Sequence, residues 1–564
     1  MPRPPRATGP VLRPFRLGPA LLLIWLLALV LALVGLGNLP LRDWDEGIVA
    51  RVALETGLAP WPAKLLPSFW GGPYLNKPPG LHLLIGAAIG LWRSLVGAAA
   101  GALPPEWVVR IVPALVSSTL PPLLGLVQWR LRPGDRAAAL ATATMALTLM
   151  PLARSGRLAM LDGSQLVAMA LLWWAVLGVG PDRRSPVLGG LLAGLATAAL
   201  LLLKAPLAFP VLLATLALRW WEGGLPAAVW RRLLLAVALG LLPGLAWHGF
   251  HAVLRGPEAL AMWTSQGFAR VGQSIEGHGG GPLMPLLKVL EGGWPWLPLW
   301  PFGLALAWRQ RRQRAGLWGL GLTLITALLV LPLRTQLPWY SLLLWPPFCL
   351  VCAPVLAWMA GPASGSLAAS AAGPRPVPPP GAALLARVPW FWSLLGGLCL
   401  LAALLAAASL LPLPAAALPL ALLLGAALLV GGWLLRPRPG RRGVAGVLVL
   451  AGGVWGTLVL LFAGPLWLWE LNETWPAPPV AALVASAPQL KAAGAPAPAL
   501  WQESERPSLN WYAGRRLPVA ADPPVAAELA LLSRSAPAIA GYRCLEQGRS
   551  GRLGLYRCQR QPAD

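Results

Sequence analysis

A series of long apolar runs separated by short arginine clusters constrains this chain more than any other feature. A bilayer core about 30 Å thick is crossed by about 20 apolar helical residues. Hydrophobic residues make up 57% of the 564 positions and charged residues only 12%, whereas soluble domains carry about 25% charged residues. Because irregular backbone cannot face lipid, the sequence predicts an all-α polytopic membrane protein.

Thirteen runs are long and apolar enough to be predicted as membrane spans. They are 19–36, 107–129, 137–152, 164–180, 187–203, 207–220, 233–253, 294–308, 317–333, 339–359, 390–411, 415–435 and 444–461. One further run, Pro78 to Val96, begins with Pro-Pro-Gly and carries His82 and Arg93. Its composition alone leaves open whether it crosses the membrane.

The arginine clusters decide this question, because cytoplasmic loops are enriched in Lys and Arg. If 78–96 does not cross, the basic N-terminus and the clusters at 130–136, 183–184, 231–232, 309–314 and 436–442 all lie inside. If it does cross, all the later clusters lie outside. We therefore predict that 78–96 is a re-entrant or interfacial helix, with a cytoplasmic N-terminus and an extracytoplasmic C-terminus, in the inner or plasma membrane.

This topology divides the chain into two predicted domains. Residues 1–466 form the transmembrane domain, with outer loops 37–106, 153–163 and 254–293 and a cytoplasmic Pro-rich linker at 361–388. Residues 467–564 form a small extracytoplasmic α/β domain, with strands expected at 517–521 and 553–558. Cys544 and Cys558 flank a predicted hairpin in it. A disulfide between them is left open, and it would require an oxidising compartment.

The formal net charge of +25 does not indicate a nucleic-acid partner. The arginines lie in short clusters between apolar runs and form no continuous basic face. The chain also contains no phosphate-binding glycine loop and no nucleotide-binding fingerprint.

The predicted outer loops contain four groups of polar residues. The first group is Asp43, Asp45 and Glu46, of which a helix N-cap would explain only one. The second is Lys77, just before the Pro-Pro start of a helix, where an anion is favoured. The alternative for Lys77 is that its side chain extends to the lipid headgroups.

The third group is Arg157 with Asp162 in a short outer loop, where the alternative is that these residues pair with each other or anchor the loop. The fourth is Arg270, Gln273, Glu276 and His278, in a loop longer than a connection needs. An acidic cluster and several cations on one outer face suit the phosphate headgroup of a lipid, with carboxylates available to orient or deprotonate an acceptor hydroxyl.

These groups, in this order, resemble the membrane glycosyltransferases of the protein O-mannosyltransferase and aminoarabinose lipid A transferase group, which share the GT-C fold. The resemblance covers residues 42–347. Asp45-Glu46 is similar to the family's Asp-Glu first loop, Asn76-Lys77-Pro78-Pro79 to its Lys-Pro-Pro box, and Arg157 with Asp162 to its Arg and Asp second loop. Arg270 to His278, with Trp294-Pro295-Trp296, is similar to the long loop between spans seven and eight. Leu337-Pro338-Trp339-Tyr340 is similar to a later Lys-x-x-x-Tyr box.

The resemblance implies inverting transfer of a sugar from an undecaprenyl- or dolichyl-type phosphate to an extracytoplasmic lipid or protein acceptor. It implies a catalytic group of Asp45, Glu46 and Asp162. Binding of the lipid phosphate would fall to the basic residues Lys77, Arg157, Arg270 and His278.

Two departures from the family pattern stand out. Asn76 replaces a Glu that contributes to a metal site in the aminoarabinose transferases, so no metal ligand is assigned here and a divalent cation is left open. Gln336 stands near where the later box has Lys, which leaves the lipid and the sugar open.

Two other functions compete with this interpretation. A transporter or flippase for lipid-linked saccharides would also need many spans and a basic phosphate site, and it would show charged residues at mid-span and inverted repeats. A scaffold protein of the envelope would instead use its tail and would tolerate substitution of Asp45 and Lys77.

Overall fold

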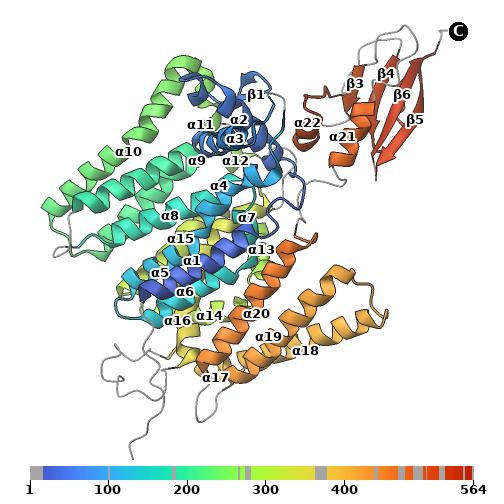
Figure 1. The fold of residues 1–564 in the computed structure, drawn as a ribbon. Coiled ribbons are helices and arrows are strands. Elements are labelled where there is room, and N and C mark those ends of the chain that lie inside the picture. Colours follow the sequence, from blue (N-terminus) through green and yellow to red (C-terminus); the bar gives the residue numbers. More distant parts are fainter. Residues whose placement is uncertain are drawn as a thin grey trace, which may run out of the picture.

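The computed structural model describes residues 17–99, 102–180, 186–264, 267, 269–273, 281, 283–361, 378–436, 443–467, 477–486, 499–502, 505–519, 528–550 and 553–561. Within these residues the chain forms a body of packed helices with a small sheet at one side (Figure 1). Most of the predicted Pro-rich linker, from 362 to 377, lies outside the described residues.

Every one of the thirteen predicted spans is helical over most of its length. The corresponding helices are α1 (Leu17–Leu33), α4 (Glu106–Ser118) with α5 (Leu120–Leu131), α6 (Arg136–Thr148) with α7 (Met150–Gly156), α8 (Leu161–Leu177), α9 (Pro186–Glu222), α10 (Ala227–Arg255), α14 (Trp300–Arg309), α15 (Arg314–Val330), η5 (Pro338–Leu344) with α16 (Trp345–Ala360), α18 (Val388–Ala407), α19 (Leu418–Leu435) and α20 (Gly443–Ala463).

The number thirteen is not confirmed. By length and composition, seven helices among the described residues can cross a membrane, or eight if α6 and α7, bent by 62°, form one span. Several other predicted spans are helices of 17 residues or fewer, α1, α8 and α15 among them. The all-α polytopic fold class is confirmed.

Helix α9 is one of these seven helices, yet it contains two predicted spans. Its backbone leaves the helical conformation at Lys204 (φ −148°, ψ 80°). Gly190 lies against Leu233 and Ala236, and Gly244 against Ala198, so the first half of α9 runs parallel to α10. Because only four residues join the end of α9 to the start of α10, the second half must run back, with Lys204 at the turn.

A second contact supports this helical hairpin. Near the end of α9, Arg219 donates a hydrogen bond to the carbonyl of Val179, 3.2 Å away, just before α9 begins. Both ends of α9 therefore lie at the same end of the helical body. The close parallel approach of α9 and α10 uses glycines, as membrane helix interfaces often do.

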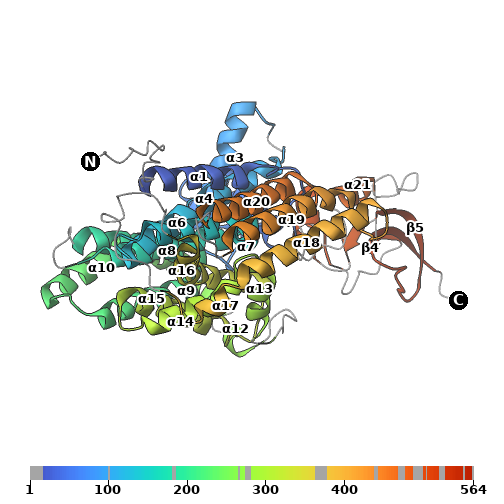
Figure 2. The ribbon, with the colours of Figure 1, turned by 90° about the horizontal axis from the view of Figure 1, so that it is seen from below.

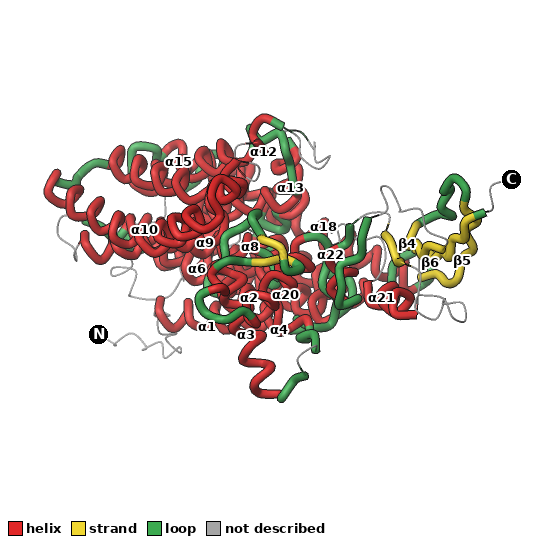
Figure 3. Tube along the Cα trace, turned by 90° about the horizontal axis from the view of Figure 1, so that it is seen from above, coloured by secondary structure: helices red, strands yellow, loops and turns green. Residues whose placement is uncertain are grey.

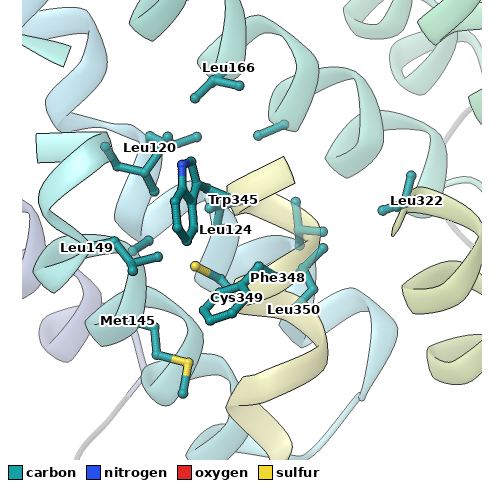
Figure 4. Packing of buried hydrophobic residues seen from close by; sticks show 14 of the residues in the cluster. Leu120, Leu124, Met145, Leu149, Leu166, Leu322, Trp345, Phe348, Cys349 and Leu350 are labelled. Atoms are coloured by element: carbon teal, nitrogen blue, oxygen red, sulfur yellow. The ribbon is translucent and has the colours of Figure 1, made fainter. Parts of the chain in front are cut away.

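The centre of the helical body is helix α16, which is buried along most of its length. Figure 4 shows Trp345, Phe348 and Cys349 of α16 packed among side chains that include Leu124 and Leu149. Large aromatic side chains bury much apolar surface, so this helix fixes the helices that surround it.

The first long loop forms a cap on one end of the helical body. It contains α2 (Asp45–Leu58), the short strands β1 (Ser68–Phe69) and β2 (Gly72–Pro73), and α3 (Gly80–Val96). The buried residues of α3 lie between Leu81 and Ile89, and the rest of the helix projects from the body (Figures 2 and 3). Shorter elements of the long later loop, α11 (Ala261–Trp263), α12 (Ala269–Gly272) and α13 (Met284–Gly292), complete this part of the structure.

The tail forms the small α/β domain that the sequence predicts. Its elements are α21 (Ala477–Ser486), β3 (Ala499–Gln502), α22 (Pro507–Tyr512), β4 (Glu528–Ser533), β5 (Tyr542–Ser550) and β6 (Leu553–Arg560), with strand order β3-β4-β6-β5. Strands β3 and β4 are parallel and the other pairs are antiparallel. Helix α22 lies on the side of the sheet that faces the helical body (Figures 1 and 3).

The paired cysteines lie in this sheet. Cys544 of β5 and Cys558 of β6 are direct partners in the strand register and form a disulfide. The predicted strand 553–558 lies within β6. The other predicted strand, 517–521, contributes one bridge, from Val519 to Gln502, and residues 520 and 521 lie outside the described part of the chain.

Candidate functional site

The site is built around Asp45, the first residue of α2. Burial, followed by the nearby Asp162 carboxylate, raises the pKa of Asp45 to about 6, whereas Lys77, Lys204 and Arg270 act in the opposite direction. Two acidic and three basic residues from five separate places in the chain therefore share one electrostatic environment. Three of the residues that the sequence predicts to share a site with Asp45, namely Lys77, Asp162 and Arg270, are brought together here.

Direct contacts link three of the other site residues, Asp162, Lys204 and Arg270, to one another through Tyr340. The Nζ atom of Lys204 lies 3.4 Å from Oδ1 of Asp162 and 5.1 Å from the centre of the Tyr340 ring. Arg270 donates a hydrogen bond of 3.0 Å to the Tyr340 hydroxyl. Asp162, Lys204, Tyr340 and Arg270 thus form one network across α8, α9, η5 and α12.

Lys77 is presented by the turn before α3. A Cβ atom on Gly80 would lie 2.6 Å from the carbonyl oxygen of Leu202, so only glycine permits this close approach to the end of the first half of α9. A ring nitrogen of His82 contacts the Pro78 carbonyl at 3.2 Å. Burial, Lys204 and Arg270 lower the pKa of Lys77 to about 8. The turn therefore places Lys77 among other cations, where an anion would be stabilised.

Arg270 is held by the segment between α15 and η5. Its backbone carbonyl accepts hydrogen bonds from the amides of Arg334 (3.1 Å) and Thr335 (3.2 Å). Gln336, which stands near the position of the lysine in the related box, donates through Nε2 to the carbonyls of Val330 and Leu333 at the end of α15. Gln336 therefore caps a helix, and Tyr340 is the residue of this segment that reaches the site.

Glu46 occupies a different environment from its neighbour Asp45. Its carboxylate receives two hydrogen bonds from Arg110, of 2.7 and 2.8 Å, one from the amide of Ala159 (2.8 Å) and one from the amide of Arg42 (3.0 Å). The Glu46 side chain is 1% exposed. This geometry does not favour the predicted catalytic role of Glu46, because its acceptor positions hold the loop in place.

Arg157 also serves the framework. It is fully buried, donates to the carbonyls of Leu31 and Val34, and lies over the rings of Phe462 (4.3 Å) and Trp467 (4.4 Å). These contacts tie the end of α1 to the end of α20. The geometry does not favour the predicted contact of Arg157 with a lipid phosphate.

The remaining predicted residues are placed as follows. Asp43 binds α22 of the tail, Asn76 is exposed, and Gln273 is exposed at the end of α12. Glu276 and His278 lie outside the described residues. In the described part of the chain, no group of three His, Cys, Asp or Glu side chains is close enough to hold a metal ion.

Lys204 is the site residue that the sequence reasoning missed. It is one of only five lysines and lies at the break between two apolar runs, two residues before Pro206. An ionisable residue inside an apolar segment is expensive and tends to be functional. That rule would have identified it.

The comparisons with known proteins agree with the motifs. Residues 84–245 match the model of the dolichyl-phosphate-mannose-protein mannosyltransferase family. No curated protein shows significant sequence similarity to the chain.

Two solved structures match nearly the whole chain. The structure of ArnT from Cupriavidus metallidurans with undecaprenyl phosphate bound is 18% identical, with a TM-score of 0.66, over 95% of this chain and 97% of that one. The same protein in the apo state is 17% identical, with a TM-score of 0.65, over 96% and 98%. The family match and the shared fold confirm the resemblance, and the chain has the ArnT-like GT-C fold.

Proposed function

We propose that the protein is a glycosyltransferase that moves a sugar, with inversion, from a polyprenyl phosphate to an extracytoplasmic lipid or protein acceptor. The observation that carries this proposal is the placement of Asp45 and Asp162 against Lys77, Lys204 and Arg270. Three cations can hold a phosphate, and a carboxylate beside them can serve the acceptor. The solved relative with undecaprenyl phosphate bound supports a polyprenyl phosphate as the donor class.

The reaction would exchange one bond at the anomeric carbon. The acceptor oxygen forms a bond to that carbon as the bond to the phosphate oxygen breaks, and the polyprenyl phosphate leaves with the electron pair. Lys77, Lys204 and Arg270 stabilise the charge that develops on the leaving phosphate. The site also holds donor and acceptor in line, which removes much of the entropic cost of their reaction.

Asp45 would have one of two tasks, depending on the acceptor. If the acceptor is a hydroxyl, Asp45 takes its proton as a general base, for which a pKa of about 6 is well suited. If the acceptor is a phosphate, no proton is removed and Asp45 orients it. In both cases Asp162 holds Lys204 by an ion pair, and its negative charge raises the pKa of Asp45.

The other predicted residues receive revised or retained roles. We assign Glu46 and Arg157 to holding the first loop and the ends of α1 and α20, on the contacts given above. His278 keeps its place in the proposal as a secondary contact to phosphate or acceptor.

We further propose that this end of the molecule is extracytoplasmic and that the N-terminus is cytoplasmic. The arginine clusters support this orientation. The disulfide between Cys544 and Cys558 supports it as well, because disulfides persist in oxidising compartments.

Donor binding tests the phosphate site directly. Purified protein in detergent is incubated with radiolabelled polyprenyl-phosphate sugars, and the affinity is measured for wild type and for Lys77→Met, Lys204→Met and Arg270→Met. Each substitution should weaken binding about tenfold or more, because a charge-assisted hydrogen bond contributes about 1.5–3 kcal/mol. The matched control is Lys288→Met, whose lysine pairs with Glu291 on α13. If Lys77→Met, Lys204→Met and Arg270→Met all bind the donor with the same affinity as wild type and the control, the proposed phosphate site is refuted.

The same preparation separates the enzyme from the transporter. Wild-type protein should release polyprenyl phosphate and pass label to a lipid or protein fraction. Binding of the donor with no turnover in the presence of membrane acceptors would instead support a transporter.

A further inference from the structure

Helix α22 of the tail contacts the first loop on both sides of Asp45. Before Asp45, the amide of Ser508 donates a hydrogen bond of 2.7 Å to Oδ1 of Asp43. Nη1 of Arg506 lies 3.8 Å from Oδ2 of the same carboxylate. The side chain of Asp43 is 0% exposed, so this carboxylate is buried at the junction between the tail and the helical body.

The hydroxyl of Tyr512 makes a second connection at the far end of α22. It accepts a hydrogen bond of 2.7 Å from the amide of Leu41 and donates one of 2.7 Å to Oε1 of Glu106. Glu106 is the first residue of α4. One phenol of the tail therefore joins the start of the first loop to the helix that carries Arg110.

After Asp45, the contact is between backbones. A Cβ atom on Gly47 would lie 2.5 Å from the amide nitrogen of Ser508 and 2.6 Å from the carbonyl carbon of Pro507. No other residue at position 47 would permit this approach. Next to it, Trp511 is 2% exposed and belongs to the same apolar cluster as Val49 and Ala50 of α2.

These contacts complete a clamp on the loop. On the side of the helical body, Arg110 binds Glu46 and donates to the carbonyls of Leu39 and Pro40. From the tail, α22 binds residues 41, 43 and 47. Asp45 lies between the two sets of contacts, and its backbone is fixed from both.

We propose that α22 positions the part of the first loop that carries Asp45. Arg506, Ser508 and Tyr512 of the tail are then positioning residues for Asp45, and the active site depends on the tail. The inference rests on the proposed function and extends it. None of these residues touches the reacting atoms. They act through Asp43, Leu41 and Gly47 on the direction of the Asp45 carboxylate. A displacement of about 1 Å at a catalytic group can reduce the rate about 100-fold.

The test compares two substitutions of Asp43 in the full-length protein. Asp43→Ala removes the acceptor for the Ser508 amide, whereas Asp43→Asn keeps an oxygen that can accept it. With polyprenyl-phosphate sugar as donor, Asp43→Ala should lower kcat about 10- to 100-fold and leave the KM for donor within about twofold of wild type. Asp43→Asn should lower kcat less than about fivefold. The control is Arg549→Ala, which removes an exposed ion pair with Glu546 in the same domain.

Hydrogen exchange gives a second readout that does not depend on turnover. In Asp43→Ala the amides of residues 41–50 should exchange at least about tenfold faster than in wild type, while those of β4 and β6 keep their protection. Tyr512→Phe, which removes the donor to Glu106, replaces Asp43→Ala if that variant fails to fold.

The outcomes separate the two claims. Unchanged exchange at residues 41–50, or a kcat loss in Arg549→Ala equal to that in Asp43→Ala, overturns the positioning role. A kcat that stays at the wild-type value in Asp43→Ala, with wild type active, also overturns it. A wild type that turns over no donor refutes the proposed function, and hydrogen exchange then still decides whether α22 fixes the loop.

Discussion

Asp45 and Lys77 have pKa values that approach each other from opposite directions. Burial raises that of Asp45 to about 6 and lowers that of Lys77 to about 8. Asp45 must be ionised to accept a proton, so kcat/KM should rise as the pH increases through about 6. Lys77 must be charged to hold phosphate, so kcat/KM should fall as the pH increases through about 8. We expect a bell-shaped profile for a hydroxyl acceptor, measured as initial transfer rates at low donor concentration.

Asp162→Asn tests the origin of the acidic limb of this pH profile of kcat/KM. The substitution removes a like charge that raises the pKa of Asp45, so the acidic limb should move to lower pH. The Asp162 carboxylate also raises the pKa of Lys77, so the basic limb should move to lower pH as well. An acidic limb that moves upward or does not move would contradict the electrostatic coupling of the two carboxylates.

Substitutions of the neighbours Glu46 and Asp45 should have different effects on stability. Glu46→Gln breaks a buried ion pair with Arg110, and the loss of one partner costs about 3–5 kcal/mol. We expect a clear fall in the thermal unfolding midpoint in detergent. Asp45→Asn should not lower that midpoint, because burial already disfavours its charge. Equal midpoints for Glu46→Gln and wild type would contradict the structural role of Glu46.

The site could be predicted from the sequence in part. Asp45, Lys77, Asp162 and Arg270 were identifiable as polar residues in the predicted loops between apolar runs. The sequence does not show which partner such a residue meets, and this is why Glu46 and Arg157 were assigned to chemistry. Arg110, the partner of Glu46, lies 64 positions away inside a predicted span, where nothing marks it as the residue that binds this loop.

At the scale of elements, α9 shows how a turn can place a charge. The sequence predicts two spans at 187–203 and 207–220, and the contacts with α10 show that the two halves of α9 double back at Lys204. The turn brings Lys204 to the same end of the body as α2 and α3. An apolar helix hairpin thus presents a cation at the site.

The β5–β6 hairpin of the tail depends on its disulfide. The two cysteines are 14 positions apart, and closing a loop of about 15 residues contributes about 3 kcal/mol. The double substitution Cys544→Ser with Cys558→Ser should make this hairpin sensitive to limited proteolysis, whereas the helical body remains intact. If the cleavage pattern and rate match those of wild type without reductant, the disulfide does not stabilise the tail.

At the scale of the whole molecule, the site and the tail lie at one end of the helical body. Cysteine labelling tests the proposed orientation. A membrane-impermeant maleimide applied to intact cells should label Arg516→Cys, since Arg516 is 53% exposed in the tail. It should label Arg311→Cys only after the membrane is opened, because that exposed residue belongs to a predicted cytoplasmic cluster. Labelling of Arg311→Cys alone in intact cells would reverse the orientation.

The fold class could be predicted because long apolar runs report directly on the bilayer. The span count could not be confirmed from helix length. Helices such as α1 and α15 are shorter than a full span, and the predicted span at 339–359 combines η5 with α16. The docking of α22 on the first loop joins residues more than 460 positions apart, and no local pattern reports such a contact.

The most direct test of the account is transfer by Asp45→Asn. Wild type, Asp45→Asn and the control Glu291→Gln, an exposed carboxylate on α13, are purified and supplied with radiolabelled polyprenyl-phosphate sugar and membrane acceptors. We predict that Asp45→Asn binds the donor but transfers label about 100- to 10,000-fold more slowly, while Glu291→Gln matches wild type. Transfer by Asp45→Asn at the wild-type rate would contradict the assignment of Asp45 and the active site built around it.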